Sequence, residues 1–333
     1  MKISILIPAY ARPEQLGEAL ASIALQDRSL IGEIIVSDDS PRAYWERNQA
    51  AIAASGLADL IEYLPHEPSK GTYPNQCFLG QQAKCSHLLF LHNDDLLCEG
   101  ALRSLVDACA IETDPRVVLW FGSNLIMDES GRIDDTRTAE NASKYGKGGH
   151  AEARPMWRWC LTESIPPNAF LIATEMYLRH MKGPRDGNVG DWALYVRLAN
   201  SGTWARYIAR NVSAYRVQPG SVTTAGRGMD VHLFHEHAEH LVVPPEATAD
   251  KRHRFAALAP VATIRYAREG ERLNAWRCFL SPNWTWRQRF SARGAATVVA
   301  LLLPRWLWNW ALRYRTHAAV YASELMILSS VIG

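Results

Sequence analysis

The chain has 333 residues, of which 48% are apolar and 21% are charged, and its formal net charge is +2. These values exclude a disordered chain and suit one large domain or two smaller ones. The small net charge hides a division, because the sequence from residue 251 onward has 13 Lys and Arg against three acidic residues. The preceding 250 residues have 23 Lys and Arg against 31 acidic residues. We therefore expect two parts with different partners.

The first 125 residues alternate short apolar runs with helical patterns. Strands are expected in ISILIPAY, EIIVSDD, LIEYL, HLLFLHNDD and VVLWFGS, and helices after Arg12-Pro13 and across YPNQCFLGQQAKC. Near-continuous apolar strands between helices predict a mostly parallel sheet that is covered on both faces. The first run turns polar at once and lacks a small-residue cleavage site, which favours a strand over a signal peptide.

Polar residues close three of these expected strands. They are Tyr10, the pair Asp38 and Asp39, and the pair Asp94 and Asp95. Ligands of parallel sheets bind at the carboxyl ends of strands, so we expect these side chains along one edge of one cleft. Two adjacent carboxylates after an apolar run repel each other unless a cation lies between them. The second pair is therefore either a solvated turn or a cation site.

The later segments are less regular. Residues 136–155 are polar and contain glycines, so a mobile loop beside the cleft and a plain surface excursion are equal alternatives. Residues 190–202 predict a helix that stops at Gly202. Four histidines within residues 232–240 suggest zinc, but the pattern is not H-E-x-x-H, and we favour a solvated helix face. The six cysteines form no C-x-x-C pair, which favours reduced, buried thiols.

Taken in order, these segments resemble the family 2 glycosyltransferases, which are inverting enzymes of the GT-A fold. The matching stretches are SILIPAYAR, EIIVSDDS, KGTYPNQCFLGQQA, LLFLHNDDLL, GDWALYVRLANSG and YRVQPGSVT, and together they cover roughly residues 1–225. The resemblance implies a Rossmann-like α/β domain over residues 1–235, with a mostly parallel sheet flanked by helices. A basic, aromatic-rich helical extension would follow over residues 236–333.

The resemblance also implies a set of site residues. Asp191 is expected as the general base for the acceptor hydroxyl, with a simple helix N-cap as the alternative. The expected nucleotide-binding residues are Pro8, Tyr10, Arg12, Asp38 and Asp39, and those for the donor sugar and phosphates are Lys70, Asn75 and Asn93. The expected acceptor residues are Trp157, Trp159, Trp192 and Arg216, although core packing is at least as common a role for tryptophan.

The metal motif departs from the family pattern. Relatives have Asp-x-Asp, whereas this chain has His92-Asn93-Asp94, and Gln218 stands where relatives often place a histidine. We expect Asp94 to anchor Mg²⁺ or Mn²⁺ that is weakly held without the nucleotide. His92 is expected as a hydrogen-bonding neighbour or a helper ligand. For Asp95 we favour a cap on a helix that starts at Leu96.

Residues 284–317 are basic and aromatic, with six Arg, five Trp and no acidic residue. Their longest uncharged stretch, Gly294 to Pro304, has eleven residues and is too short to span a bilayer. This composition favours helices that lie on an anionic membrane surface. Helices packed on the catalytic domain are an alternative. A nucleic-acid partner is not expected, since no recognition module is apparent.

These features together predict an inverting glycosyltransferase on the cytosolic face of a membrane. It would move a sugar from a nucleotide diphosphate sugar, with UDP-sugars expected, to a hydroxyl of a glycan or a lipid-linked glycan such as a polysaccharide precursor. Two alternatives stay open. A catalytically inactive membrane scaffold is kept open by His92 in the metal motif. A nucleotidyltransferase is disfavoured, because PAYARPEQ is not a Gly-rich basic loop.

Overall fold

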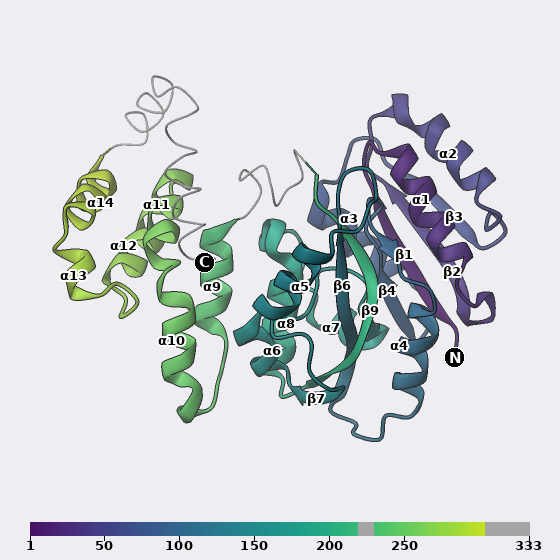
Figure 1. Cartoon of the computed structure of the whole chain (residues 1–333). Coiled ribbons are helices and arrows are strands. Elements are labelled where there is room, and N and C mark those ends of the chain that lie inside the picture. Colours follow the sequence, from purple (N-terminus) through teal and green to yellow (C-terminus); the bar gives the residue numbers. More distant parts are fainter. Residues whose placement is uncertain (219–229, 304–333) are drawn as a thin grey trace. The chain divides into compact units, whose positions relative to one another are not determined.

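The computed structural model describes residues 1–218 and 230–303, and the chain forms two compact units, Met1–Pro219 and Gly220–Gly333 (Figure 1). The division precedes the expected boundary at residue 235, because helix α9 (Val231–His240) packs on α11 (Ala259–Glu269) within the second unit. Two sequence predictions lie outside the described residues: the end of the YRVQPGSVT segment and the basic, aromatic sequence from residue 304 onward.

One mixed sheet organises the first unit, with the strand order β3-β2-β1-β4-β8-β6-β9-β5 and with β7 paired to β9. Strands β1 to β4 are mutually parallel where they pair, and β6 is parallel to β9, whereas β8 is antiparallel to β4 and β6. The strands are β1 (Ile3–Ala9), β2 (Ile31–Asp38), β3 (Ile61–Pro65), β4 (His87–Phe90), β5 (Leu96–Leu97), β6 (Val117–Met127), β7 (Glu152–Pro155), β8 (Leu171–Ala173) and β9 (Trp204–Arg216). The predicted α/β fold with a largely parallel sheet is confirmed.

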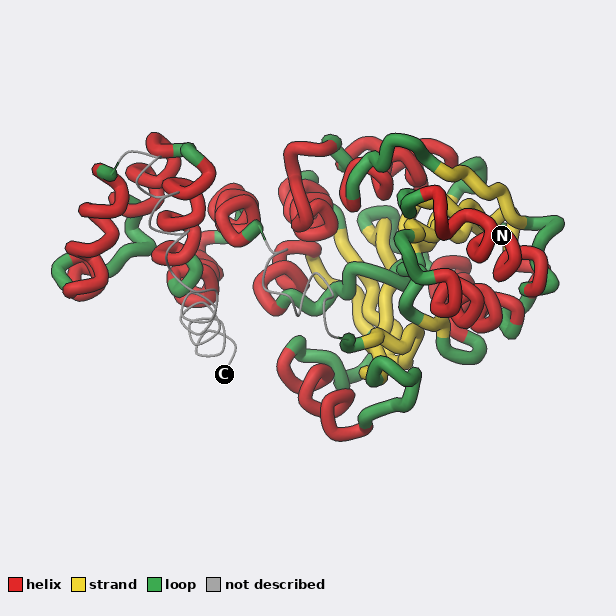
Figure 2. The backbone as a smooth tube through the Cα atoms, turned by 90° about the horizontal axis from the view of Figure 1, so that it is seen from above, coloured by secondary structure: helices red, strands yellow, loops and turns green. Residues whose placement is uncertain are grey.

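Helices cover both faces of this sheet, as Figure 2 shows. The helices of this unit are α1 (Pro13–Ala24), α2 (Trp45–Ala54), α3 (Thr72–Gln82), α4 (Ala101–Ala110), α5 (Asp135–Lys144), α6 (Met156–Thr162), α7 (Thr174–His180) and α8 (Gly190–Asn200). Short 3-10 turns stand at η1 (Arg28–Leu30), η2 (Arg42–Tyr44) and η3 (Pro184–Val189).

The alternation of side chains along the strands explains the two covered faces. Ile3, Ile5 and Ile7 of β1 join one apolar core with Leu16 and Leu20 of α1 and with the apolar face of α4. On the opposite face, Phe90 of β4 packs against Tyr177 of α7, with the ring centroids 5.2 Å apart. Because both faces are buried, the strands read as continuous apolar runs, and the polar residues that follow them are held at a rigid edge.

The polar segment 136–155 differs from both expectations, because its first part is helix α5 and its last part is strand β7. The side chain of Asp134 caps α5 by accepting a hydrogen bond from the Arg137 backbone N–H at 2.9 Å. No residue of α5 is buried, so the apolar periodicity that would have predicted a helix is absent from its sequence.

The second unit is helical in its described part. Its elements are α9 (Val231–His240), η4 (Pro245–Ala247), α10 (Thr248–Ala256), α11 (Ala259–Glu269), α12 (Arg272–Leu280), α13 (Trp286–Arg289) and α14 (Ala292–Leu302). Its core gathers Tyr266, Phe279, Trp284 and small residues of α11 and α12. None of the described helices, in either unit, is long and apolar enough to cross a membrane.

The predicted helix around the four histidines is confirmed as α9, but two of the four histidines do not lie on a solvated face. His232 and His235, three residues apart, lie on its buried face. The Tyr266 hydroxyl donates to the His232 carbonyl oxygen at 2.9 Å, and the His235 ring lies 4.0 Å from the Cys278 sulfur. Burial lowers the pKa of both imidazoles, which are therefore neutral packing groups.

Candidate active site

Three strand ends meet at one edge of the sheet, as the sequence predicts. The parallel pairing of β1 with β2 and β4 places residues 9–12, 38–40 and 92–95 side by side. The Asp39 backbone N–H donates to the Ala9 carbonyl at 2.9 Å, and the Ala11 N–H donates to the Ser40 hydroxyl at 2.7 Å. Ala11 has a φ of 50°, which is uncommon for a residue other than glycine and is typical of functional turns.

The aspartates after β2 are buried and bonded to protein donors. Asp38 accepts from the Asn48 amide at 2.7 Å, from the Tyr63 hydroxyl and from the Ser40 backbone N–H. Asp39 accepts from the backbone N–H groups of residues 70 and 71 and from the Ser69 hydroxyl, all within 2.7 Å. These contacts fold the loop after β3 onto the strand end. Both carboxylates therefore shape the edge of the sheet at the end of β2.

The remaining nucleotide and donor candidates occupy different environments. Tyr10 is 57% exposed beside this edge, where its ring is free to stack, whereas Pro8 is partly buried. Asn75 of α3 is buried and donates to the Ser37 carbonyl oxygen at 3.0 Å, so it ties α3 to β2. Lys70 is exposed, with its ammonium 4.5 Å from the centre of the Phe78 ring.

The turn after β4 carries the metal candidates. One ligand atom each from His92, Asp94 and Asp95 lies within 4.8 Å of the others. Burial lowers the pKa of the His92 imidazole, which leaves a neutral ring able to act as a ligand or a hydrogen-bonding partner. The buried side-chain amide nitrogen of Asn93 has no hydrogen-bond partner in the described part of the chain. One imidazole and two carboxylates at this spacing fit a divalent cation.

Asp95 does not cap a helix, because residues 96–97 form strand β5 and the next helix begins at Ala101. The expected capping role is therefore wrong. The Asp95 carboxylate is buried and accepts from the Asn168 side-chain amide and from the Arg216 backbone N–H at 2.8 Å. Burial and then the charge of Asp94 raise the pKa of this carboxyl well above its usual range. Its contacts fix the metal-motif turn against β9 and the loop before β8.

Asp191 stands in the first turn of α8 and not at its N-cap, which is Val189. A side chain at Gly190 would overlap the Tyr73 ring of α3, so the Gly-Asp sequence lets α8 begin against that ring. The Tyr73 hydroxyl donates to Asp186 at 3.2 Å, and Asp186 pairs with Arg197 of α8. This network holds the start of the helix in place.

The surroundings of Asp191 suit a proton acceptor. The carboxylate accepts from the Trp192 backbone N–H at 2.8 Å. Burial raises the pKa of the Asp191 carboxyl, an effect that this hydrogen bond opposes in part. Asp191 acts in turn on the pKa of His92, so the two side chains are electrostatic neighbours. The fold thus brings the predicted base of α8 to the metal motif after β4.

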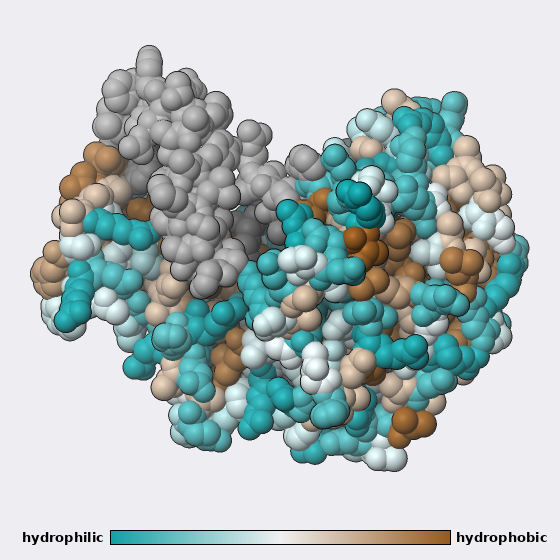
Figure 3. Space-filling model, viewed as in Figure 1, coloured by the Kyte–Doolittle hydropathy of each residue, from teal (hydrophilic) through white to brown (hydrophobic). Residues whose placement is uncertain are grey.

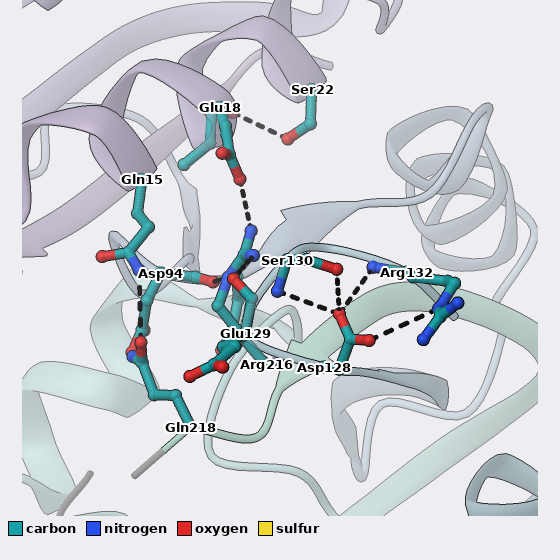
Figure 4. Close-up of polar contacts among 12 residues, drawn as sticks. Gln15, Glu18, Ser22, Asp94, Asp128, Glu129, Ser130, Arg132, Arg216 and Gln218 are labelled. Carbon is teal, nitrogen blue, oxygen red and sulfur yellow. Dashed lines mark hydrogen bonds and ion pairs between the residues drawn. The ribbon is translucent and has the colours of Figure 1, made fainter. Parts of the chain in front are cut away.

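Arg216 lies in the interior of the first unit, and Figure 4 shows the contacts of its guanidinium. Its guanidinium donates to the Asp94 carbonyl oxygen at 2.8 Å and to the Glu129 carbonyl oxygen at 3.0 Å, and it pairs with Glu18 of α1. A single buried cation therefore joins the ends of β9 and β6 to α1 and the metal motif. We assign it a positioning role.

The three tryptophans expected at the acceptor also differ in placement. Trp159 is in the core, where its indole N–H donates to the Ala205 carbonyl oxygen at 3.0 Å and its ring packs on Phe121. Trp192 is buried beside Asp191 in sequence. Trp157 is partly exposed and keeps a surface on which a sugar ring could stack.

Sequence reasoning missed Asn168, Glu18 and Gln15, which hold the turn and its neighbours. Asn168 interrupts the apolar run PPNAFLIA, and a lone amide in such a run is the signal that could have revealed it. Gln15 and Glu18 lie three residues apart on α1, and both reach toward β9, as Figure 4 shows. No local pattern in the sequence distinguishes them from ordinary surface residues of a helix.

The sequence of residues 4–163 matches the family model for glycosyl transferase family 2. The matched segment contains the strand ends, the metal-motif turn and the helices between them. The matched segment belongs to glycosyl transferase family 2. None of the curated proteins compared with this chain matches it in sequence.

Solved structures with the same fold include other glycosyltransferases. The mannosyltransferase of Pyrobaculum calidifontis, solved with GDP-mannose and Mn²⁺, has a TM-score of 0.57 at 15% identity over 99% of this chain and 86% of its own. S. aureus TarS 1–349 with UDP-GlcNAc has a TM-score of 0.54 at 15% identity, over 90% of this chain and 82% of its own. The longer TarS chain gives 0.53 at 14% identity, and the present chain spans 48% of it. These structural matches show that the chain has the GT-A fold.

Proposed function

We propose that this family 2 glycosyltransferase moves a sugar from a nucleotide diphosphate sugar to a hydroxyl of a glycan or lipid-linked glycan, with inversion at the transferred carbon. The observation that carries the proposal is the electrostatic interaction of Asp191 with His92, which belongs to the metal-motif turn of His92, Asp94 and Asp95. A single base beside a single diphosphate site suits direct displacement, since inversion needs one group to deprotonate the attacking hydroxyl.

Each part of the site has a task in this reaction. Tyr10 and the edge formed by Asp38 and Asp39 would hold the base and ribose, and Arg12 lies where it can reach the phosphates. A divalent cation bound by Asp94, with His92 beside it, would neutralise the charge that builds on the leaving diphosphate. The Asp191 carboxylate would accept the proton of the acceptor hydroxyl.

UDP-sugars and GDP-sugars are the donors to test first, because structural neighbours were solved with UDP-GlcNAc and GDP-mannose. The full chain is incubated with a panel of nucleotide sugars and Mg²⁺ or Mn²⁺, and both thermal stabilisation and release of nucleoside diphosphate are measured. One donor class should stabilise the fold and be hydrolysed slowly. Binding without turnover on any acceptor or water would favour the inactive scaffold instead.

The rate should depend on pH through Asp191. A general base works in its deprotonated form, and burial raises the pKa of this carboxyl above the ordinary aspartate value. Turnover should therefore fall as the pH drops, with its midpoint above about 3.9, the value for an unperturbed aspartate. The measurement is kcat against pH at saturating donor and acceptor, with circular dichroism to confirm folding. A kcat that stays flat down to about pH 4 would contradict this role.

We also propose that the second unit binds an anionic membrane surface, where a lipid-linked acceptor would lie. Trp286 of α13 and Phe290, the residue that follows this helix, have stacked rings with centroids 5.3 Å apart, and they are 71% and 78% exposed. Arg287 and Arg293 beside them are also exposed. Apolar side chains show at the surface over α13 and α14 in Figure 3. Exposed aromatic rings among arginines suit the headgroup layer of anionic lipid.

Vesicle sedimentation tests this surface. The full chain should bind vesicles that contain anionic lipid, and bind them more weakly as salt rises, because screening shortens the reach of the arginine charges. Replacing Trp286 and Phe290 with alanine should reduce the bound fraction several-fold. The matched control replaces Leu25 and Ile111 of the first unit with alanine. These side chains are 76% and 79% exposed, and their loss should leave vesicle binding unchanged. Equal loss in both double variants, or no binding by the wild-type chain, would contradict the proposal.

A further inference from the structure

The carboxylate of Asp94 has two side-chain partners within the protein. Its Oδ2 atom pairs with the Arg12 guanidinium and accepts a hydrogen bond from the Gln218 side-chain amide at 2.9 Å. Gln218 is itself oriented by Gln15 of α1, whose amide donates to the Gln218 side-chain oxygen at 3.1 Å. Figure 4 shows Gln15 and Gln218 converging on Asp94. The oxygen that would anchor a cation thus has a cationic partner and an amide donor.

The position of Arg12 allows its ion pair with Asp94 to break while the fold stays intact. Arg12 follows the turn at Ala11 and is the N-cap residue of α1, but its side chain makes no capping hydrogen bond. The Arg12 side chain is 31% exposed, whereas that of Arg216, the other arginine at this turn, is 1% exposed and has three protein partners. Arg216 therefore holds the fold, whereas the Arg12 side chain makes no hydrogen bond other than that to Asp94 within residues 1–218 and 230–303.

We infer that Arg12 competes with the divalent cation for Asp94, and that the diphosphate of the donor resolves the competition. Like charges repel, so a cation can take its place on Asp94 only when the guanidinium moves away. A diphosphate offers Arg12 a second anionic partner with the geometry that a guanidinium prefers. Metal binding is therefore weak in the free protein and tightens when the nucleotide is bound. This inference rests on the proposed nucleotide-sugar site.

The consequence is a coupling between the two ligands. Arg12 neutralises the charge of Asp94 in the free protein, so metal alone binds weakly. Nucleotide and metal then bind with positive coupling, and by linkage each raises the affinity of the other by the same factor. Couplings of this kind are typically about 5–150-fold, so the effect is large enough to measure.

Binding of Mn²⁺ alone, followed by the loss of its free-ion EPR signal, tests the competition. In Arg12→Met the chain keeps an apolar stem of similar length and loses the guanidinium, and its affinity for Mn²⁺ without nucleotide should rise by about tenfold or more. Gln218→Leu removes the neutral donor on the same oxygen and should give a smaller rise. Arg47→Ala is the matched control, since Arg47 pairs with Glu14 of α1 at the surface, and it should leave Mn²⁺ affinity unchanged.

Titration of the same proteins with UDP and GDP completes the test. Without metal, Arg12→Met should bind the nucleotide diphosphate more weakly, so one substitution moves the two affinities in opposite directions. A merely structural role would weaken both. Unchanged or lower Mn²⁺ affinity in Arg12→Met, or an equal rise in Arg47→Ala, would overturn the competition. If Mn²⁺ affinity rises while no protein binds either nucleotide, the competition stands and the proposed donor class fails.

Discussion

Replacing Asp191 with asparagine should lower kcat by at least about 100-fold and leave donor affinity within about twofold of the wild-type value. The change keeps the size of the side chain and its hydrogen bond with the Trp192 backbone N–H, which Asp191 makes at 2.8 Å. It removes only the basicity that deprotonation of the acceptor requires. The helix should be undisturbed, because its start is held by Tyr73, Asp186 and Arg197.

Steady-state kinetics at saturating donor and acceptor measure this effect, and isothermal titration with the nucleoside diphosphate measures donor affinity. Asp186→Asn is the informative comparison, since it loosens the network that holds α8 and should lower stability as well as rate. A near-normal kcat in Asp191→Asn would contradict the role of this residue as general base, whatever kcat is measured for Asp186→Asn.

Replacing Asp94 with asparagine should abolish the effect of metal on donor binding. Loss of one outer-shell partner of a metal commonly costs about 10–100-fold in affinity, so loss of the anchoring carboxylate should cost at least about 100-fold. The donor should then bind equally well, and weakly, with Mg²⁺, with Mn²⁺ or with chelator. His92→Asp should keep the metal effect or strengthen it, because it adds a second hard oxygen ligand at a partly buried position.

Donor affinity across a metal titration decides between these outcomes. Asp59→Asn, at an exposed carboxylate that pairs with Arg28, is the control for a general change of charge in the same unit. If Asp94→Asn retains the metal dependence of the wild type, the cation is held elsewhere. If His92→Asp loses it, then the imidazole is a required ligand and not a neighbour.

The sequence predicted the elements whose pattern is local. The five strands and helix α3 follow from apolar runs and from helical spacing, and the polar residues after β1, β2 and β4 could be placed at one edge from parallel pairing alone. Helix α5 was missed because it buries no residue, and its stability depends on a cap at Asp134 and on contacts with β6.

Partners distant in sequence were beyond such reasoning. Arg216 pairs with Glu18, 198 residues away in sequence, and Gln218 donates to Asp94, 124 residues away. No spacing pattern in the sequence predicts either contact. The role expected of Asp95 failed for the same reason, since the cap was inferred from its neighbours while its partners are Asn168 and Arg216. Residues that a local sequence pattern assigns to the surface can therefore hold the site residues in place in the folded sheet.

The stereochemistry of transfer tests the proposed reaction most directly. The wild-type chain is supplied with the donor identified in the nucleotide-sugar panel and with an acceptor alcohol that it glycosylates, and the anomeric configuration of the glycoside is read by proton NMR. The glycoside does not interconvert between anomers, so the product preserves the outcome of the reaction. One base at Asp191 and direct displacement predict a β-glycoside from an α-linked donor, and its formation should be lost in Asp191→Asn. An α-glycoside would contradict the account, because retention of configuration needs a different arrangement of catalytic groups.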